Sequence, residues 1–336
     1  MSIIKPFLNA LKYIVFFGLA LTLLFLAFRN QDPSELFNEL LKVDFVWVVV
    51  SMIFGTLAIV SRGVRWLILI DSLGYTSSKA NSIYSVAIGY FSNIAILRAG
   101  EITRCTSLNQ TEKIPVDKLF GTIILERIID FFILIILIGI TFILKFHYIR
   151  DFFFTTFNNI DQKELNNIFL VLFMIIVLSL LLFFVFKTRI RSLYIYDKVK
   201  QFFIGISDGI KSLSYVKNKV HFFGHTVFIW LMYFAMTYIC FFCIPATSNL
   251  SLSDGLFIMV IGGIGMVIPT PGGFGSYHFA VKNGLMLLGI NEGIFYSNTD
   301  PGLLFATTVH SAQTLMTLIF GSVSLFLLFI RKNRNT

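Results

Sequence analysis

The sharpest chemical signal in the sequence is a group of ionisable residues inside a long apolar stretch. Glu126, Arg127 and Asp130 lie within residues 119–144, which hold no other charged residue. At about 1.5 Å of rise per residue, a helix starting at 119 places Asp130 about 16 Å along its axis, close to the middle of a hydrocarbon core about 30 Å thick. The two carboxylates share a helical face at a spacing of four and would repel each other without a cation. Such a network indicates function by default, and a purely structural buried network is the alternative.

Two arginines follow the apolar stretch 45–61. Arg62 and Arg65 are three residues apart and precede Trp66, so both guanidinium groups lie near one helical face. A pair of arginines can bind a phosphate bidentately, and a tryptophan suits the headgroup level. The alternative is an ordinary basic flank that marks the cytoplasmic side.

A third group, Arg98, Glu101 and Arg104, has spacings of three and can pair along one helix. A solvated surface ladder is the alternative. Together the sequence predicts phosphate-binding arginines and an intramembrane charge network. The first set is Arg62, Arg65, Arg98 and Arg104, and the second is Glu101, Glu126, Arg127 and Asp130.

A turn rich in glycine and proline interrupts the apolar region 252–290. Glycines let the backbone approach a ligand and expose N–H groups to an anion, whereas a simple helix break is the alternative. The candidate residues of this turn are Pro269, Pro271, Gly272, Gly273, Gly275, His278 and Lys282.

Other chemistry has little support. His221 and His225 have a metal-like spacing but no obvious third ligand, and Cys240 and Cys243 lie in an apolar stretch that favours packing over redox chemistry. His310 and Gln313 could line a polar cavity or cross-link helices. Motifs of nucleotide hydrolases, zinc peptidases and serine hydrolases are missing. We therefore expect no metal, no cofactor and no enzymatic activity.

Composition identifies the elements that must carry these residues. The chain has 336 residues, 56% hydrophobic and 13% charged, against about 25% charged in soluble domains. This predicts an all-α polytopic membrane protein, residues 1–336 forming one transmembrane domain. Six stretches are long enough for full spans, and 81–97 and 252–290 are interrupted or re-entrant. The predicted spans are 9–28, 45–61, 119–144, 167–186, 222–244 and 302–330.

The net charge of +9 is interpreted as an orientation signal and not as a nucleic-acid surface, because basic residues gather in loops on one side. The loop 187–219 holds eight basic residues against two aspartates, which places it in the cytoplasm together with both termini. Each full span moves the chain to the other side of the membrane, so the number of spans between two loops decides whether they share a side. This parity count predicts that 81–97 enters the cell membrane from the cytoplasm and returns, with Arg98 to Lys118 still inside. The region 252–290 is either a hairpin from the exterior or two short spans.

The ordered series Arg62-x-x-Arg65-Trp66, Arg98-Ala-Gly-Glu101-x-x-Arg104, Glu126-Arg127-x-x-Asp130 and Pro269-x-Pro271-Gly272-Gly273-x-Gly275 resembles the lysylphosphatidylglycerol synthase transmembrane-region family. This is the flippase-like domain of the multiple peptide resistance factor, also found as stand-alone membrane proteins. Where the family commonly has an acidic residue after the last element, this chain has Tyr277-His278. No soluble aminoacyl-transferase domain follows in the sequence, so the synthase activity of the family name is not expected.

The resemblance implies binding and movement of an anionic lipid between leaflets, and membrane lipids are the expected partners. The expected substrate is an anionic phospholipid or a polyprenyl-phosphate-linked lipid. Two alternatives remain open. One is a membrane enzyme that modifies lipid headgroups with Glu126, Asp130 and His278. The other is a non-catalytic partner of a lipid-modifying enzyme or glycosyltransferase. Oligomeric state is not predicted.

Overall fold

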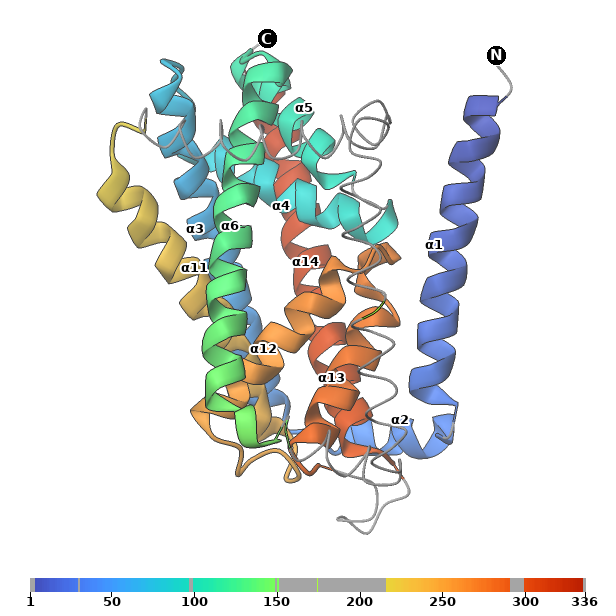
Figure 1. Cartoon of the computed structure of the whole chain (residues 1–336). Coiled ribbons are helices and arrows are strands. Elements are labelled where there is room, and N and C mark those ends of the chain that lie inside the picture. The colour runs from blue at the N-terminus through green and yellow to red at the C-terminus, as the bar shows by residue number, and fades with distance from the viewer. Residues whose placement is uncertain are drawn as a thin grey trace. The chain divides into compact units, whose positions relative to one another are not determined.

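The computed structural model describes residues 4–29, 31–96, 99–148, 216–290 and 299–334, with the single residues 150 and 174. The chain divides into two compact units, residues 1–144 with 216–336 and residues 145–215. The predicted span 167–186 and most of the loop 187–219 lie outside the described residues, so these predictions, like that of one domain, stay predictions. The described helices are α1 (Ile4–Phe28), α2 (Pro33–Leu41), α3 (Phe45–Ser72), α4 (Lys79–Ala95), α5 (Gly100–Glu112), α6 (Val116–Leu144), α11 (Lys219–Ile239), α12 (Leu252–Val267), α13 (Ser276–Leu287) and α14 (Pro301–Arg334), with short 3-10 turns η2 (Cys240–Cys243) and η3 (Pro271–Gly273) (Figure 1).

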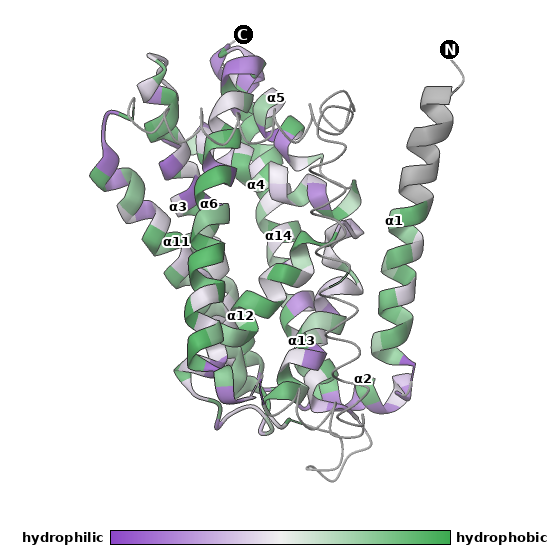
Figure 2. Ribbon diagram, viewed as in Figure 1, coloured by the Kyte–Doolittle hydropathy of each residue, from purple (hydrophilic) through white to green (hydrophobic). Residues whose placement is uncertain are grey.

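Four described helices are long and apolar enough to cross a membrane: α3, α6, α11 with η2, and α14. Helix α1 forms a bent pair with α2, at 80°, which would make a fifth span. Figure 2 shows hydrophobic residues along these helices and hydrophilic residues gathered toward their two ends. Together with the absence of strands among the described residues, this confirms a polytopic helical membrane protein.

Helices α4 and α5 form a hairpin. The Glu112 carboxylate at the end of α5 accepts hydrogen bonds from Ser78 N at 2.9 Å and from Asn81 Nδ2 at 2.8 Å, at the start of α4. At 17 residues, α4 is about 26 Å long and does not cross a core of about 30 Å. The prediction that 81–97 enters and returns by itself was wrong, because α4 is one continuous helix over most of this range and the returning leg is α5, which was expected to lie in the cytoplasm. Arg104 of α5 is buried and bound to Glu126 of α6.

Helices α12 and α13 form a second hairpin, which decides between the two alternatives for 252–290. They have 16 and 12 residues, about 24 and 18 Å, too short for separate spans. Gly265 lets α12 pack closely on α13. A Cβ at this position would lie only 3.0 Å from the Ala280 Cβ and from the Ser276 carbonyl oxygen. Gly272, Gly273 and Gly275 have φ of 58°, 80° and 82°, values that favour glycine. The turn needs these glycines to reverse the chain within the protein interior.

Contacts between helix ends define a basic face and an acidic face of the first unit. On the basic face, Lys217 N donates to the Ser72 hydroxyl at 3.2 Å, and Arg331 donates to Ser78 at 3.2 Å. These contacts join the end of α3 to the starts of α4 and α11 and the end of α14. Lysines 79, 113, 118 and 219 are at the same ends of their helices. This is the face that the positive-inside rule predicts to be cytoplasmic.

The acidic face lies at the opposite ends of the same helices. Asp44 N donates to the Cys243 carbonyl at 3.0 Å, and Asp300 N donates to Gln31 Oε1 at 2.8 Å. Asp32 caps α2, and hydrogen bonds from the Ser34 hydroxyl and from backbone N–H groups hold the pKa of this carboxyl below its usual value. The α4–α5 hairpin therefore enters from the basic face and the α12–α13 hairpin from the acidic face.

The tips of the two hairpins meet inside the protein. A Cβ at Gly272 would lie 3.7 Å from the Cα of Ile94 near the end of α4. His310 Nε2 of α14 lies 2.9 Å from the Gly272 carbonyl oxygen and ties the turn to a spanning helix. Irregular backbone at this depth is thus enclosed by protein, as a membrane interior requires.

Candidate functional site

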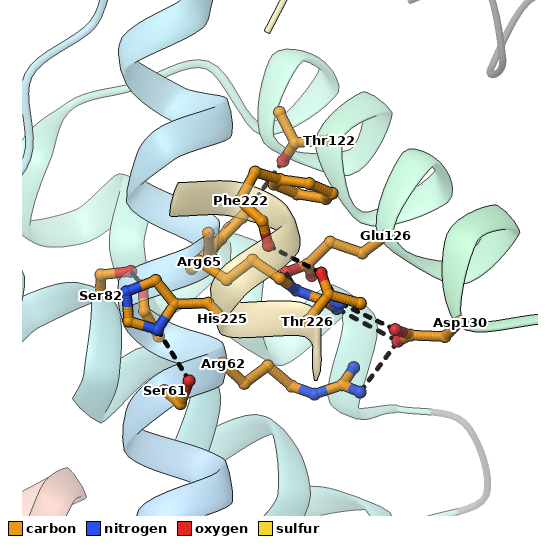
Figure 3. Close-up of polar contacts among 12 residues, drawn as sticks. Ser61, Arg62, Arg65, Ser82, Thr122, Glu126, Asp130, Phe222, His225 and Thr226 are labelled. Carbon is orange, nitrogen blue, oxygen red and sulfur yellow. Dashed lines mark hydrogen bonds and ion pairs between the residues drawn. The ribbon is translucent and has the colours of Figure 1, made fainter. Parts of the chain in front are cut away.

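Five residues form a buried charge cluster where α3, α5 and α6 meet. Asp130 Oδ2 lies 2.8 Å from Arg62 Nη2, and Asp130 Oδ1 lies 2.8 Å from Arg65 Nη1. Glu126 Oε2 lies 2.7 Å from Arg104 Nη1, and Glu126 Oε1 lies 3.5 Å from Arg65 Nε. Figure 3 shows both guanidinium groups of α3 directed at Asp130. The cations that the sequence required for the two carboxylates are therefore present.

Helix α3 positions two of these arginines because it runs to Ser72 and does not end at residue 61. The predicted span 45–61 was too short, and the alternative of an ordinary basic flank is wrong, since both arginines are buried against other helices. Hydropathy ended the span at these charges because sequence alone does not show that Glu126 and Asp130 neutralise them. The spacing of three does place both side chains on one face, as predicted.

Aromatic side chains complete the environment of the cluster. The Arg104 guanidinium lies 3.8 Å from the centroid of the Trp66 ring, and the indole N–H of Trp66 donates to Thr122 Oγ1 at 2.7 Å. Trp66 is fully buried, so its ring packs inside the protein and does not contact lipid headgroups. A desolvated cation–π contact of this kind is worth about 2 kcal/mol.

The buried charge cluster carries a surplus of positive charge. Its three arginines face two carboxylates, and Arg104 Nε and Nη2 and Arg62 Nε are buried without an acceptor among the described residues. Arg62 and Arg104 also line a charged pocket of about 20 Å³, enough for about one water molecule. An unsatisfied buried donor costs about 1–3 kcal/mol, so an anion next to these groups would be stabilised.

Arg127 and Glu101 form a second, more accessible ion pair. Arg127 Nε lies 3.1 Å from Glu101 Oε1, and the two side chains are 50% and 38% exposed. The predicted pairing of Glu101 with Arg104 on one helix was wrong, because Arg104 reaches Glu126 and Glu101 reaches Arg127. Both contacts join α5 to α6 instead of running along α5.

A central cavity of about 430 Å³ lies beside this pair, between the hairpin tips and the spanning helices. Tyr90 Oη and Tyr233 Oη lie 3.0 Å apart. Arg127, Tyr90 and Asn93 line both the central cavity and the charged pocket, which makes the two spaces neighbours. The polar and aromatic residues of its lining include Tyr90, Asn93, Arg127, Trp230, Tyr233, Tyr277, His310 and Gln313.

The predicted turn residues separate into two groups. Gly272 lines the central cavity, and His278 lies behind it, with its ring centroid 4.9 Å from that of His310. Lys282 lies away from the turn, where its Nζ is 3.0 Å from Asp300 Oδ2. The expectation that His278 and Lys282 act together from the turn has no support from these contacts.

Arg98 and the histidine pair His221 and His225 have separate outcomes. Arg98 lies outside the described residues, and its role stays a prediction. His225 Nδ1 lies 2.8 Å from the Ser61 hydroxyl, while His221 Nδ1 lies 2.8 Å from Asn218 Oδ1. In the described ranges no cluster of three or more metal-type ligands occurs.

Sequence reasoning missed Tyr90, Tyr233 and Trp230, which border the central cavity. Of the three, Trp230 could have been singled out from the sequence. It lies in the middle of the apolar stretch 222–244, whereas tryptophans of membrane helices are enriched at the interfaces. Its indole N–H is buried without an acceptor among the described residues.

Comparison with known proteins gives the chain a family. It is 24% identical over 270 residues to the UPF0104 membrane protein MJ1595 of Methanocaldococcus jannaschii, covering 72% of this chain and 75% of that protein. No solved structure matches the chain. The family model of the lysylphosphatidylglycerol synthase TM region matches residues 10–321. The chain is therefore an integral membrane protein of the lysylphosphatidylglycerol synthase TM region family.

Proposed function

We propose that the protein binds an anionic lipid by its phosphate group and moves the headgroup between leaflets through the central cavity. The observation that carries this proposal is the surplus positive charge of the buried charge cluster beside a cavity at the meeting point of two opposed hairpins. Half-length elements that enter from opposite faces are the architecture with which transporters build a midplane site.

Arg127 is the residue that we assign to the phosphate. It lines the central cavity and is held by a single, half-exposed carboxylate, so exchanging Glu101 for a lipid phosphate costs little. Arg65 is fully buried and bound to both carboxylates of the cluster, which assigns it to the framework. Arg62 and Arg104 add a fixed positive field next to the phosphate.

The contacts favour transport over headgroup chemistry. Asp130 is held by Arg62 and Arg65, and Glu126 by Arg104 and Arg65. Neither carboxylate can take a proton from a substrate without first breaking an ion pair, which makes the pair poorly suited to general acid–base catalysis. A role in moving lipid uses the same charges without such a step.

A vesicle assay tests the proposal. Purified full-length protein is reconstituted with phosphatidylglycerol labelled on its acyl chain, and the label is quenched from outside. We expect protein-dependent loss of the inner-leaflet signal, a strong reduction in Arg127→Gln, and wild-type behaviour in Lys118→Gln, an exposed lysine of the same helix. If vesicles with wild-type protein behave like empty vesicles for phosphatidylglycerol and for a polyprenyl phosphate, the proposal is wrong.

A further inference from the structure

An apolar groove of about 650 Å³ lies on the first unit between α6, α11 and α12. Its volume falls within the range of about 300–1,000 Å³ that is typical of ligand sites. Every described residue of its lining except Ser253 is apolar, and Ile136, Val227 and Leu231 are more than half exposed. The groove therefore suits a hydrocarbon chain and not a polar ligand.

The groove adjoins the central cavity. Trp230 and Met259 line both spaces, so these two side chains form part of the wall between them. Methionine adapts its shape readily, and the Trp230 indole N–H is buried without an acceptor in the described part of the chain. Movement of the indole would open the wall and let its N–H donate to an ester or phosphate oxygen.

The sequence of α6 shows why both spaces belong to one ligand. Glu126, Asp130, Ile133, Leu137 and Leu144 follow one another at spacings close to whole helical turns, so they lie along one stripe of the helix. The part with carboxylates holds the arginines, and the part from residue 133 to 144 lines the groove. This stripe has the polarity of a lipid: one charged end and one apolar end.

The length and position of the groove select a leaflet. The twelve residues from Ile133 to Leu144 make eleven helical steps and span about 16 Å, close to half of a hydrocarbon core of about 30 Å. Leu144 ends α6 and Leu252 begins α12, so the groove reaches toward the acidic face. The length of the groove therefore matches one acyl chain in the leaflet on the side of the acidic face.

We propose that this groove is a lateral portal through which a lipid of the acidic-face leaflet keeps one hydrocarbon chain in the bilayer edge while its headgroup occupies the central cavity. The proposal rests on the proposed function for the headgroup, but it concerns where the chain lies. Trp230 and Met259 form the gate between the two parts of the ligand.

Photocrosslinking tests the portal without requiring transport. Full-length protein in vesicles of phosphatidylcholine with phosphatidylglycerol that carries a mid-chain diazirine is irradiated, and adducts are mapped by peptide mass spectrometry. We expect adducts on residues 133–144, 227–234 and 252–259 to exceed, several-fold, those on exposed apolar residues of α14 such as Leu318 and Phe326. Equal labelling of α14 and the groove would overturn the proposal.

Matched variants distinguish a specific groove from general lipid contact. Leu137→Trp and Val227→Trp fill the groove on two different helices, and Ile138→Trp and Val220→Trp add the same bulk to exposed positions that do not line it. We expect the first pair to lower groove adducts several-fold and the second pair to leave them unchanged. Groove adducts in a protein that does not move lipid would support the portal and overturn transport. If Leu137→Trp and Val227→Trp both leave transport intact, the result would support transport and overturn the portal.

Discussion

The buried charge cluster and the Arg127–Glu101 pair use the same residue types on neighbouring positions, yet they differ in almost every physical property. Glu126 and Arg127 are adjacent in sequence, but Glu126 is 1% exposed and Arg127 is 50% exposed. The cluster joins three helices through four ion pairs, three of them at 2.7–2.8 Å and one at 3.5 Å, whereas the Arg127–Glu101 pair depends on one contact. A charge held by several buried partners builds the fold, and a charge held by one exposed partner is free to exchange it.

The largest effect should come from breaking the cluster. Replacing Arg65 with leucine leaves Asp130 and Glu126 without the cation they share, and loss of one partner from a buried ion pair costs about 3–5 kcal/mol. We expect a large fall in the thermal unfolding midpoint of the detergent-purified protein. Lys118→Leu, at an exposed position of α6, is the matched control. Equal stability of Arg65→Leu and wild type would show that the cluster is not a framework.

A smaller effect should follow from separating α4 and α5, because α5 carries Arg104 of the buried charge cluster and Glu101 of the exposed pair. A methyl group at Gly100 would meet the Gly89 carbonyl and the Asn93 amide, and overpacking of this kind costs about 1–3 kcal/mol. Gly100→Ala should therefore lower the unfolding midpoint. Gly121→Ala meets nothing within 4 Å and should be neutral or stabilising by up to about 1 kcal/mol.

Removing the exchangeable charge should affect ligand binding and leave stability alone. We expect Arg127→Gln to weaken phosphatidylglycerol binding about tenfold, about 1.4 kcal/mol, as for one charged hydrogen bond. Its unfolding midpoint should match wild type, because the pair is half-exposed. Binding is measured by titrating the purified protein in neutral detergent. A large loss of stability without a change in binding would contradict the contrast between pair and cluster.

The smallest effect should be a gain in affinity for phosphatidylglycerol. Glu101→Gln frees Arg127 from its competing carboxylate, and an exposed ion pair is worth about 0.2–1 kcal/mol. We therefore expect phosphatidylglycerol to bind up to about fivefold more tightly to Glu101→Gln in the same titration. Weaker binding would mean that Glu101 helps to hold the ligand instead of competing with it.

Sequence reasoning predicted the architecture well where composition and parity constrain it. The apolar stretches became α1, α3, α6, α11 and α14, and the charge asymmetry predicted that 81–97 does not cross the membrane and, as one of two alternatives, that 252–290 forms a hairpin. These features follow from the length of a membrane span and from the cost of charge in lipid, which a single sequence contains.

Pairing partners could not be predicted, because they depend on helix packing. Glu101 and Arg104 have the spacing of an intrahelical pair, yet they contact residues 26 and 22 positions away. The end of α3 was misplaced for the same reason, since Arg62 and Arg65 stop a hydropathy window unless their partners are known. Lys282 of α13 likewise forms its ion pair with Asp300, which directly precedes α14.

The lipid that remains bound to the purified protein tests the central claim most directly. Mass spectrometry of lipids retained by wild type and by Arg127→Gln, each compared with the membrane from which it was extracted, measures the preference for an anionic phosphate. We predict that anionic phospholipid or polyprenyl phosphate is enriched in the wild type and lost in Arg127→Gln. Retained lipids that match the bulk membrane in both proteins would contradict the account.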